Sequence, residues 1–239
     1  NCTNITTAGA GLFATTVASA FGSAFQGCSS LAAIPVGMFD LCINATNFAN
    51  TFQGCVAVTT IPAHLFDLNT KVTSFTSTFE SCTNAALTSI PVDFFKYNTL
   101  VTSFGSTFLN CSHITSIPAG LFTTTAACAF NSVFQGCTAL TAIPVGMFDL
   151  CVNATNFANA FQGCVALTAI PANLFDLNTK VTSFGSTFES CTNVAFTSIP
   201  ADLFKYNTLV TSFTQTFLYC SRITSIPANL FTTTATCSF

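Results

Sequence analysis

The sequence predicts an α/β repeat solenoid with about 27 residues per coil, each coil holding one short strand and one short helix. Cysteines recur at spacings of 26, 27, 27 and 29 residues, and the same four spacings then repeat. All eight prolines follow an isoleucine in one column, and nearly all of the 28 phenylalanines fall into three further columns. A fixed period of this length is typical of stacked units whose equivalent side chains form continuous ladders.

We expect one solenoid domain over residues 1–239, built from a duplication with a period of 109 residues. Segment 1–130 matches segment 110–239 without a gap, so Lys71 corresponds to Lys180 and Glu80 to Glu189. The coils are expected to start near Cys2, Cys28, Cys55, Cys82, Cys111, Cys137, Cys164, Cys191 and Cys220.

The helix of each coil is predicted from its phenylalanines. Phe75, Phe79 and Cys82 are spaced i, i+4 and i+7, which places them on one face of a helix. Thr73 or Ser74 is the candidate residue to cap this helix.

The strand is predicted before the proline. Residues 58–61 are short, rich in β-formers and end at Pro62, so they are expected to form a brief strand. Residues 62–66 are expected to form one helical turn with proline at its first position, and residues 67–70 a connecting turn.

The repeat motif reads Cys-x-x-[Leu/Val/Ile]-x-x-Ile-Pro-x-x-[Leu/Met]-Phe, followed by Phe-x-x-x-Phe-x-x-Cys. It resembles the BspA-like (bacterial surface antigen) class of leucine-rich repeats. That resemblance implies a surface-exposed solenoid used in adhesion and protein binding. The units here are longer than is usual for that class, and phenylalanine replaces most of the expected aliphatic residues. One unit carries the match at Cys137, Leu140, Ile143, Pro144, Met147, Phe148, Phe157, Phe161 and Cys164.

Composition narrows the function. Only 5% of residues are charged and the net charge is −3, so the chain lacks the basic surface that binds nucleic acid. No run of about 18 apolar residues occurs, which argues against a membrane span. The chain starts at Asn1 without a basic and apolar leader, so we expect a processed protein or part of a longer one. Candidate glycosylation sites, compatible with an extracellular or cell-surface location, are Asn1, Asn4, Asn44, Asn110 and Asn153.

Nine of the thirteen cysteines belong to the repeat column, where a buried ladder of free thiols is favoured over disulfides. The other four cysteines are Cys42, Cys128, Cys151 and Cys237. We predict an intrachain disulfide between Cys128 and Cys151. Cys42 and Cys237 are left unpaired or available for a bond between subunits, and all four as free thiols is the alternative.

No catalytic, metal or cofactor site is predicted, and the chain is not expected to be an enzyme. His64 and His113 are replaced by Asn173 and Arg222 in the second copy, so neither histidine serves both copies. The acidic residues fall mostly in turns, where solvated charges are the expected state.

Three functions remain open. The first is an extracellular structural protein that assembles with itself, head to tail, into a fibre or surface layer. The second is an adhesin or receptor-binding module, with glycans or a host surface protein as partner. The third is ice or glycan binding through threonine rows such as residues 123–125 and 232–234.

Overall fold

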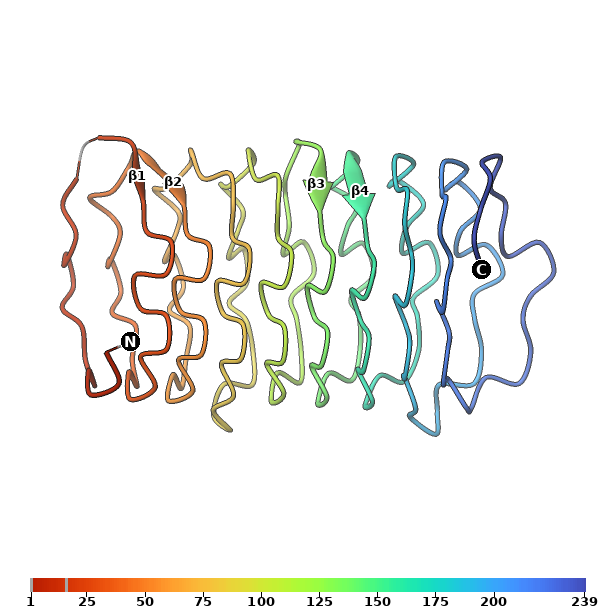
Figure 1. Cartoon of the computed structure of the whole chain (residues 1–239), viewed down its shortest axis with the longest axis horizontal. Coiled ribbons are helices and arrows are strands. Elements are labelled where there is room, and N and C mark those ends of the chain that lie inside the picture. Colours follow the sequence, from red (N-terminus) through yellow and green to blue (C-terminus); the bar gives the residue numbers. More distant parts are fainter. Residues whose placement is uncertain (1, 16) are drawn as a thin grey trace.

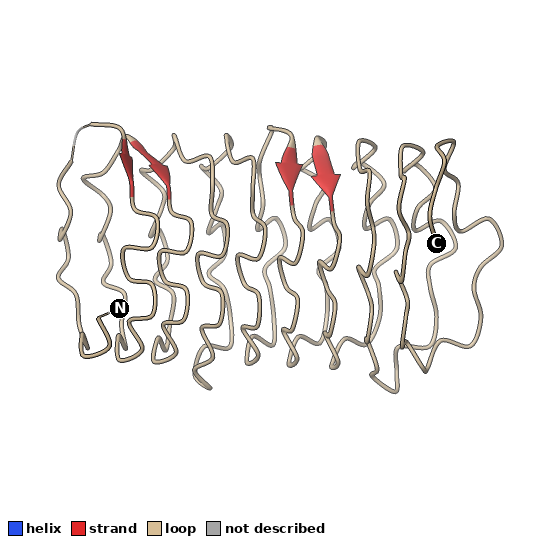
Figure 2. Cartoon of the chain, viewed as in Figure 1, coloured by secondary structure: helices blue, strands red, loops and turns tan. Residues whose placement is uncertain are grey.

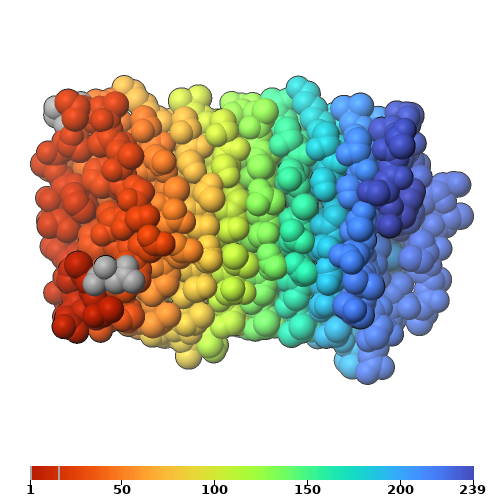
Figure 3. Space-filling view, in the orientation of Figure 1, coloured from red at the N-terminus to blue at the C-terminus, as the bar shows by residue number. Residues whose placement is uncertain are grey.

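The chain winds into coils that stack along one axis, with the two termini at opposite ends (Figure 1). This computed structural model describes residues 2–15 and 17–239. We name each coil by its first cysteine, so the Cys55 coil covers residues 55–81. Colour bands follow one another in chain order in the space-filling view (Figure 3). The architecture is therefore a repeat solenoid.

One parallel ladder runs along the stack. β1 (Ser19–Ala20) pairs with β2 (Ala45–Asn47), and β3 (Cys128–Ala129) pairs with β4 (Ala154–Asn156). Single parallel bridges extend the ladder between and beyond these strands, through Ser74 and Ser103 to Ala129 and through Ser183 and Ser212 to Ser238. The strands therefore lie before the paired phenylalanines, and no strand covers residues 58–61, where one was predicted.

The predicted helix is wrong: the described residues contain no helix, and Figure 2 shows only strands and loops. Along the segment with the paired phenylalanines, alternate N–H groups bond to the next coil. Phe75 donates to Ser103 O at 3.0 Å and Phe79 to Thr107 O at 2.9 Å. The N–H groups between them close tight turns, such as Thr78 to Phe75 O at 3.1 Å. Half of the backbone bonding here thus joins coils.

Left-handed residues explain why the helical pattern misled. Ser77 and Ser81 have φ of 54° and 58°, which no right-handed helix contains. Each is the third residue of a four-residue turn, so two turns in tandem return the side chain to the same face every four residues. The i, i+4 spacing of a helix therefore arises without a helix. His64, at φ 63°, likewise ends the helical turn predicted over residues 62–66.

The threonine proposed as a helix cap has another role. Thr73 directs its N–H and its hydroxyl to Thr46 O of the preceding coil, at 2.8 and 3.1 Å. Ser74 accepts a hydrogen bond from Thr76 N at 3.3 Å inside a local turn.

Three phenylalanine columns run through the core, together with buried leucine, isoleucine, valine and cysteine side chains, which confirms the prediction of buried phenylalanine columns from sequence. Within a column, rings of successive coils lie nearly parallel, with Phe48 and Phe75 at 5.9 Å and 7° and Phe52 and Phe79 at 5.5 Å and 12°. Between columns the rings are tilted, as for Phe66 and Phe75 at 4.8 Å and 52°. Offset stacks and tilted contacts are the favourable aromatic geometries. These rings are almost fully buried in the middle of the stack.

Candidate functional site

Most of the charge gathers in one part of each coil, the turn after the proline. All thirteen charged residues except Glu80, Glu189 and Arg222 lie there. Apolar and aromatic side chains are exposed beside them in three coils of each copy, two residues after the phenylalanine of the turn, with 47–58% of their surface exposed. We call this row the turn ridge: Leu41, Leu68, Tyr97, Leu150, Leu177 and Tyr206, with the adjoining Asp40, Asp67, Lys96, Asp149, Asp176 and Lys205.

Ionic contacts on the turn ridge are local and exposed. Lys96 Nζ lies 3.2 Å from Asp93 Oδ2 and 5.8 Å from the ring centre of Tyr97. In the second copy, burial and the neighbouring Asp202 raise the pKa of Asp176. Opposite charges lie close together, so the ridge is mixed in charge and does not form a basic or acidic patch.

Beneath the ridge runs a buried polar column. The side-chain amide of Asn69 donates to Phe39 O at 3.1 Å and to Cys42 O at 2.9 Å in the preceding coil. Its amide oxygen is buried without a partner among the described residues. Asn98, Asn178 and Asn207 repeat this arrangement. Cysteine occupies the same column at Cys42 and Cys151, each donating its thiol to one carbonyl.

The repeat cysteines form a ladder of their own. Cys111 Sγ donates to Phe79 O at 3.0 Å, and Cys137 Sγ to Phe108 O at 3.2 Å. Apart from Cys2, which is exposed, the column is buried, and the structure holds its members as free thiols. Burial raises the pKa of Cys111 and of Cys164 to about 12. Since the thiolate is the reactive form, these thiols are packing groups.

The four remaining cysteines are also free thiols in the structure. The disulfide between Cys128 and Cys151 therefore stays a prediction. Cys128 and Cys151 are both buried, and Cys151 Sγ donates to Phe122 O at 3.5 Å. Cys42 is buried in the first copy, whereas Cys237 is partly exposed at the C-terminal end.

The candidate glycosylation sites differ in access. Asn4 and Asn110 are exposed, and Asn44 and Asn153 are half-buried. Lys71 Nζ donates to Asn44 Oδ1, and Asn153 donates to Thr125 O at 2.8 Å. Asn1 lies outside the described residues. Asn4 and Asn110 are therefore the more accessible candidates.

The threonine triplets do not form exposed rows, which corrects that expectation. Thr124 is fully buried and donates to Val101 O at 2.6 Å. Thr123 donates to Phe95 O at 3.0 Å. The coil here is one residue shorter after its phenylalanine, so threonines fill the place that asparagine takes elsewhere.

The described residues offer little for catalysis or metal binding. They contain no group of three or more His, Cys, Asp or Glu side chains that could hold a metal ion. His64 lies 2.7 Å from Asp67 Oδ2 on the surface, and His113 lies 3.2 Å from Ser112 Oγ. No helix long and apolar enough to cross a bilayer occurs among them.

The C-terminal end of the stack is open. A hollow of about 380 Å³ there is lined by Phe217, Cys220, Ile223 and Ile226, with Thr224 and Ser225. Ile226 is 57% exposed, whereas its counterparts in the preceding coils are 4–6% exposed.

The chain thus combines stacked coils, hydrogen bonds between successive coils and a core of stacked side-chain columns. Solved leucine-rich repeat structures are similar to it. A leucine-rich repeat protein of T. pallidum is 18% identical, covering 87% of this chain and 71% of its own, with a TM-score of 0.26. A leucine-rich cell surface protein of Faecalibacterium prausnitzii is 15% identical, covering 84% and 68%, with a TM-score of 0.25.

The Toll–Spätzle complex of Drosophila is another similar structure, 17% identical over 79% of this chain, with a TM-score of 0.34. The present chain spans only 21% of that protein's chain. At these identities and TM-scores the likeness carries no statement about function. No protein-family model and no curated protein sequence matches the chain.

Sequence reasoning missed the turn ridge and the asparagine column. A signal for both was present. In Phe66-Asp67-Leu68-Asn69 the second residue after the phenylalanine is apolar and the third is polar. In a tight turn these two positions face opposite ways, so the apolar residue is exposed and the asparagine is buried.

Proposed function

We propose that this chain belongs to an extracellular or cell-surface structural protein that associates with copies of itself through the turn ridge, without catalytic activity. The observation that carries the proposal is the turn ridge itself, where half-exposed leucines and tyrosines recur in three successive coils of each copy. Exposed apolar side chains in a contiguous row mark interaction surfaces. Low overall charge and the accessible sequons at Asn4 and Asn110 support the location.

The duplication supports open-ended assembly. Leu41, Leu68 and Tyr97 of the first copy recur as Leu150, Leu177 and Tyr206 of the second. A neighbour that docks on one copy leaves the other copy free for a third chain. Contacts that do not close on themselves generate filaments or layers.

Charge does not oppose this contact. In each copy the turn after the proline carries three aspartates and two lysines, a net charge of −1. Two ridges can therefore approach with little like-charge repulsion, and their opposite charges can pair across the rim of the contact.

Sedimentation velocity across a concentration series, with electron microscopy of the same samples, tests the proposal. Wild-type chain is expected to form oligomers of increasing size. The double variant Leu68→Asp and Leu177→Asp is expected to remain monomeric because it adds charge to the apolar row. Val194→Asp is the matched control, since Val194 is 72% exposed away from the ridge. A wild-type chain that stays monomeric throughout refutes self-association and favours a module that binds a host surface protein.

Head-to-tail stacking is a second candidate, and the apolar lining of the hollow by Phe217, Ile223 and Ile226 favours it. A coil of a second copy would bury Ile226 there as its counterparts are buried. Ile226→Asp is expected to abolish head-to-tail contacts and leave ridge contacts intact. Ridge-dependent oligomers that persist in Ile226→Asp would exclude the hollow as their interface.

A further inference from the structure

The Ile-Pro side of the stack carries a second inter-coil ladder with two interruptions. On this side the N–H of one threonine donates to the matching carbonyl of the preceding coil, as Thr115 does to Thr88 O at 2.9 Å and Thr168 to Thr141 O at 3.1 Å. Thr88 N instead donates within its own coil, to Ala86 O at 3.0 Å. Thr197 N does the same with Ala195 O at 2.9 Å.

The interruptions have a simple cause. The coils that start at Cys82 and Cys191 span 29 residues, two more than their predecessors. The two extra residues form a bulge on the N-terminal side of the threonine. The bulge turns the threonine N–H away from the preceding coil. The carbonyl of Thr59 is consequently left without a hydrogen-bond donor among the described residues.

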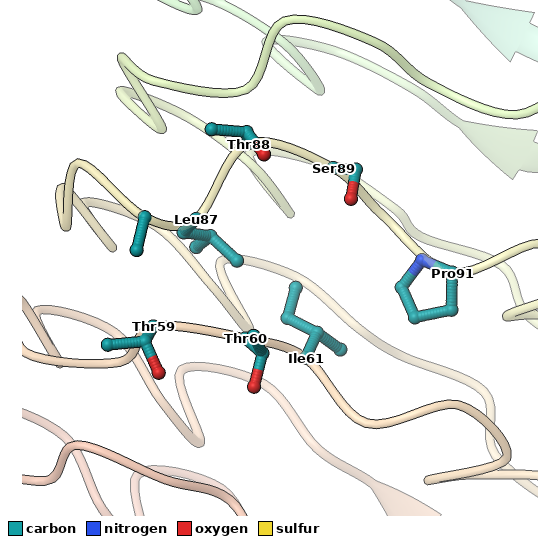
Figure 4. A pocket seen from close by; sticks show the side chains of 8 residues that line it. Thr59, Thr60, Ile61, Leu87, Thr88, Ser89 and Pro91 are labelled. Carbon is teal, nitrogen blue, oxygen red and sulfur yellow. The ribbon is translucent and has the colours of Figure 1, made fainter.

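In the first copy this interruption opens into a pocket of about 130 Å³ between two coils. Thr59, Thr60 and Ile61 come from one coil, and Leu87, Thr88, Ser89 and Pro91 from the next, with Ala86 beside them (Figure 4). We call this pocket the ladder gap. Its volume is below the roughly 300–1,000 Å³ of typical ligand pockets, so it suits one small ring or group.

The lining defines the chemistry of the ligand. No charged residue contributes to it, so a carboxylate, phosphate or ammonium group would lose water without gaining a counter-charge. Three of its hydroxyls, on Thr60, Thr88 and Ser89, have no side-chain partner among the described residues, whereas Thr59 donates to Ala32 O at 3.3 Å. Pro91 is partly exposed at the pocket, whereas Ile61 and Leu87 are 6% and 1% exposed and form its apolar floor.

A sugar ring meets these demands together. Its hydroxyls donate to a free carbonyl and exchange hydrogen bonds with free hydroxyls, while its C–H face packs on aliphatic side chains. We propose that the ladder gap between the Cys55 and Cys82 coils binds one neutral saccharide unit of a glycan.

The second copy provides an internal comparison. There Ala169 replaces Thr60 and Phe196 replaces Leu87. Phe196 is fully buried, and its ring centre lies 6.5 Å from that of Phe188. The second copy thus lacks one hydroxyl and carries a larger side chain at the equivalent place. These two differences assign the saccharide to the first copy alone.

The experiment uses the whole chain on a printed array of neutral oligosaccharides, with sialylated and sulfated glycans as charged comparators. The best neutral glycan is then titrated by calorimetry. We expect one site per chain, with affinity at least tenfold lower in Leu87→Phe and in Thr60→Ala. The double variant Ala169→Thr and Phe196→Leu is expected to bind two equivalents.

Circular dichroism and thermal melting establish that each variant is folded. The proposal is overturned if the chain binds no neutral glycan on the array, or if it binds charged glycans alone. An unchanged affinity in folded Leu87→Phe also overturns it. Because the ladder gap and the turn ridge share no residue, loss of glycan binding leaves self-association unaffected, and the two proposals fail independently.

Discussion

The side-chain amide of Asn69 donates to the backbone carbonyl of Cys42, the residue that occupies the same column one coil earlier, at 2.9 Å. Each member of this column holds the turn of its predecessor, so the turn ridge rests on a buried chain of hydrogen bonds. In this column the side-chain amide of asparagine donates two hydrogen bonds, whereas the cysteine thiol donates one.

Replacing Asn69 tests this support. Asn69→Ala removes one of the two hydrogen bonds that Phe39 O and Cys42 O each accept, and it is expected to lower the free energy of unfolding by about 1–3 kcal/mol. Asn69→Cys is expected to lower the free energy of unfolding by less, because Cys42 and Cys151 occupy this column and each donates one hydrogen bond to a carbonyl. Denaturant titration measures both, with exposed Thr70→Ala as the control. Equal losses in the alanine and cysteine variants would contradict the role of the donor.

The cysteine ladder predicts a pH dependence. A thiol titrates near 8.5 when unfolded, and burial raises the pKa of Cys111 and Cys164 to about 12. The unfolded chain therefore releases protons first as pH rises. Stability is expected to be fully present below about pH 8.5 and to fall progressively toward pH 12. Thermal melts at pH 7.5 and pH 10 measure the difference, and equal midpoints would refute it.

Alkylation checks the same ladder from its reactivity. With iodoacetamide at pH 8, the folded chain is expected to react at Cys2 and Cys237, which are exposed and partly exposed. The buried thiols should react only after denaturation. Peptide mass spectrometry identifies the modified residues. Rapid labelling of Cys111 in the folded chain would show that the ladder is accessible.

At turn positions with a positive φ, replacing glycine by alanine is expected to destabilise the chain, and replacing serine by glycine is expected to stabilise it. Gly54 has φ of 71°, and an added Cβ would lie 3.7 Å from Gly27 Cα, which is ordinary contact. The expected cost of Gly54→Ala is therefore the backbone term alone, about 1–2 kcal/mol. Ser77→Gly, at φ 54°, is expected to stabilise the chain by a few tenths to about 1 kcal/mol. Gly9→Ala, which meets nothing within 4 Å, is the control.

The stability lost when a phenylalanine ring is removed is expected to depend on its position along the stack. Phe75→Ala removes a fully buried ring with neighbours on both sides, and about 3–5 kcal/mol of stability should be lost. Phe239→Ala removes a ring that is 69% exposed and is expected to cost far less. Chemical denaturation of the two variants provides the comparison, and similar costs would contradict the nearest-neighbour nature of the core.

The sequence by itself determined the period and the burial of the phenylalanine and repeat-cysteine columns, but not the burial of the asparagine column. Phe75, Phe79 and Cys82 point inward as expected, because in a stack of coils a buried place recurs once per period and apolar side chains are buried there at no cost in lost hydrogen bonds. Tertiary structure alone decided the backbone that carries them. Phe75 N–H can bond within a helix or to Ser103 O of the next coil, and apolar spacing does not distinguish these choices. A partner 28 residues away, in the next coil, made that choice, and the same inter-coil bonding, interrupted at Thr88, opened the ladder gap.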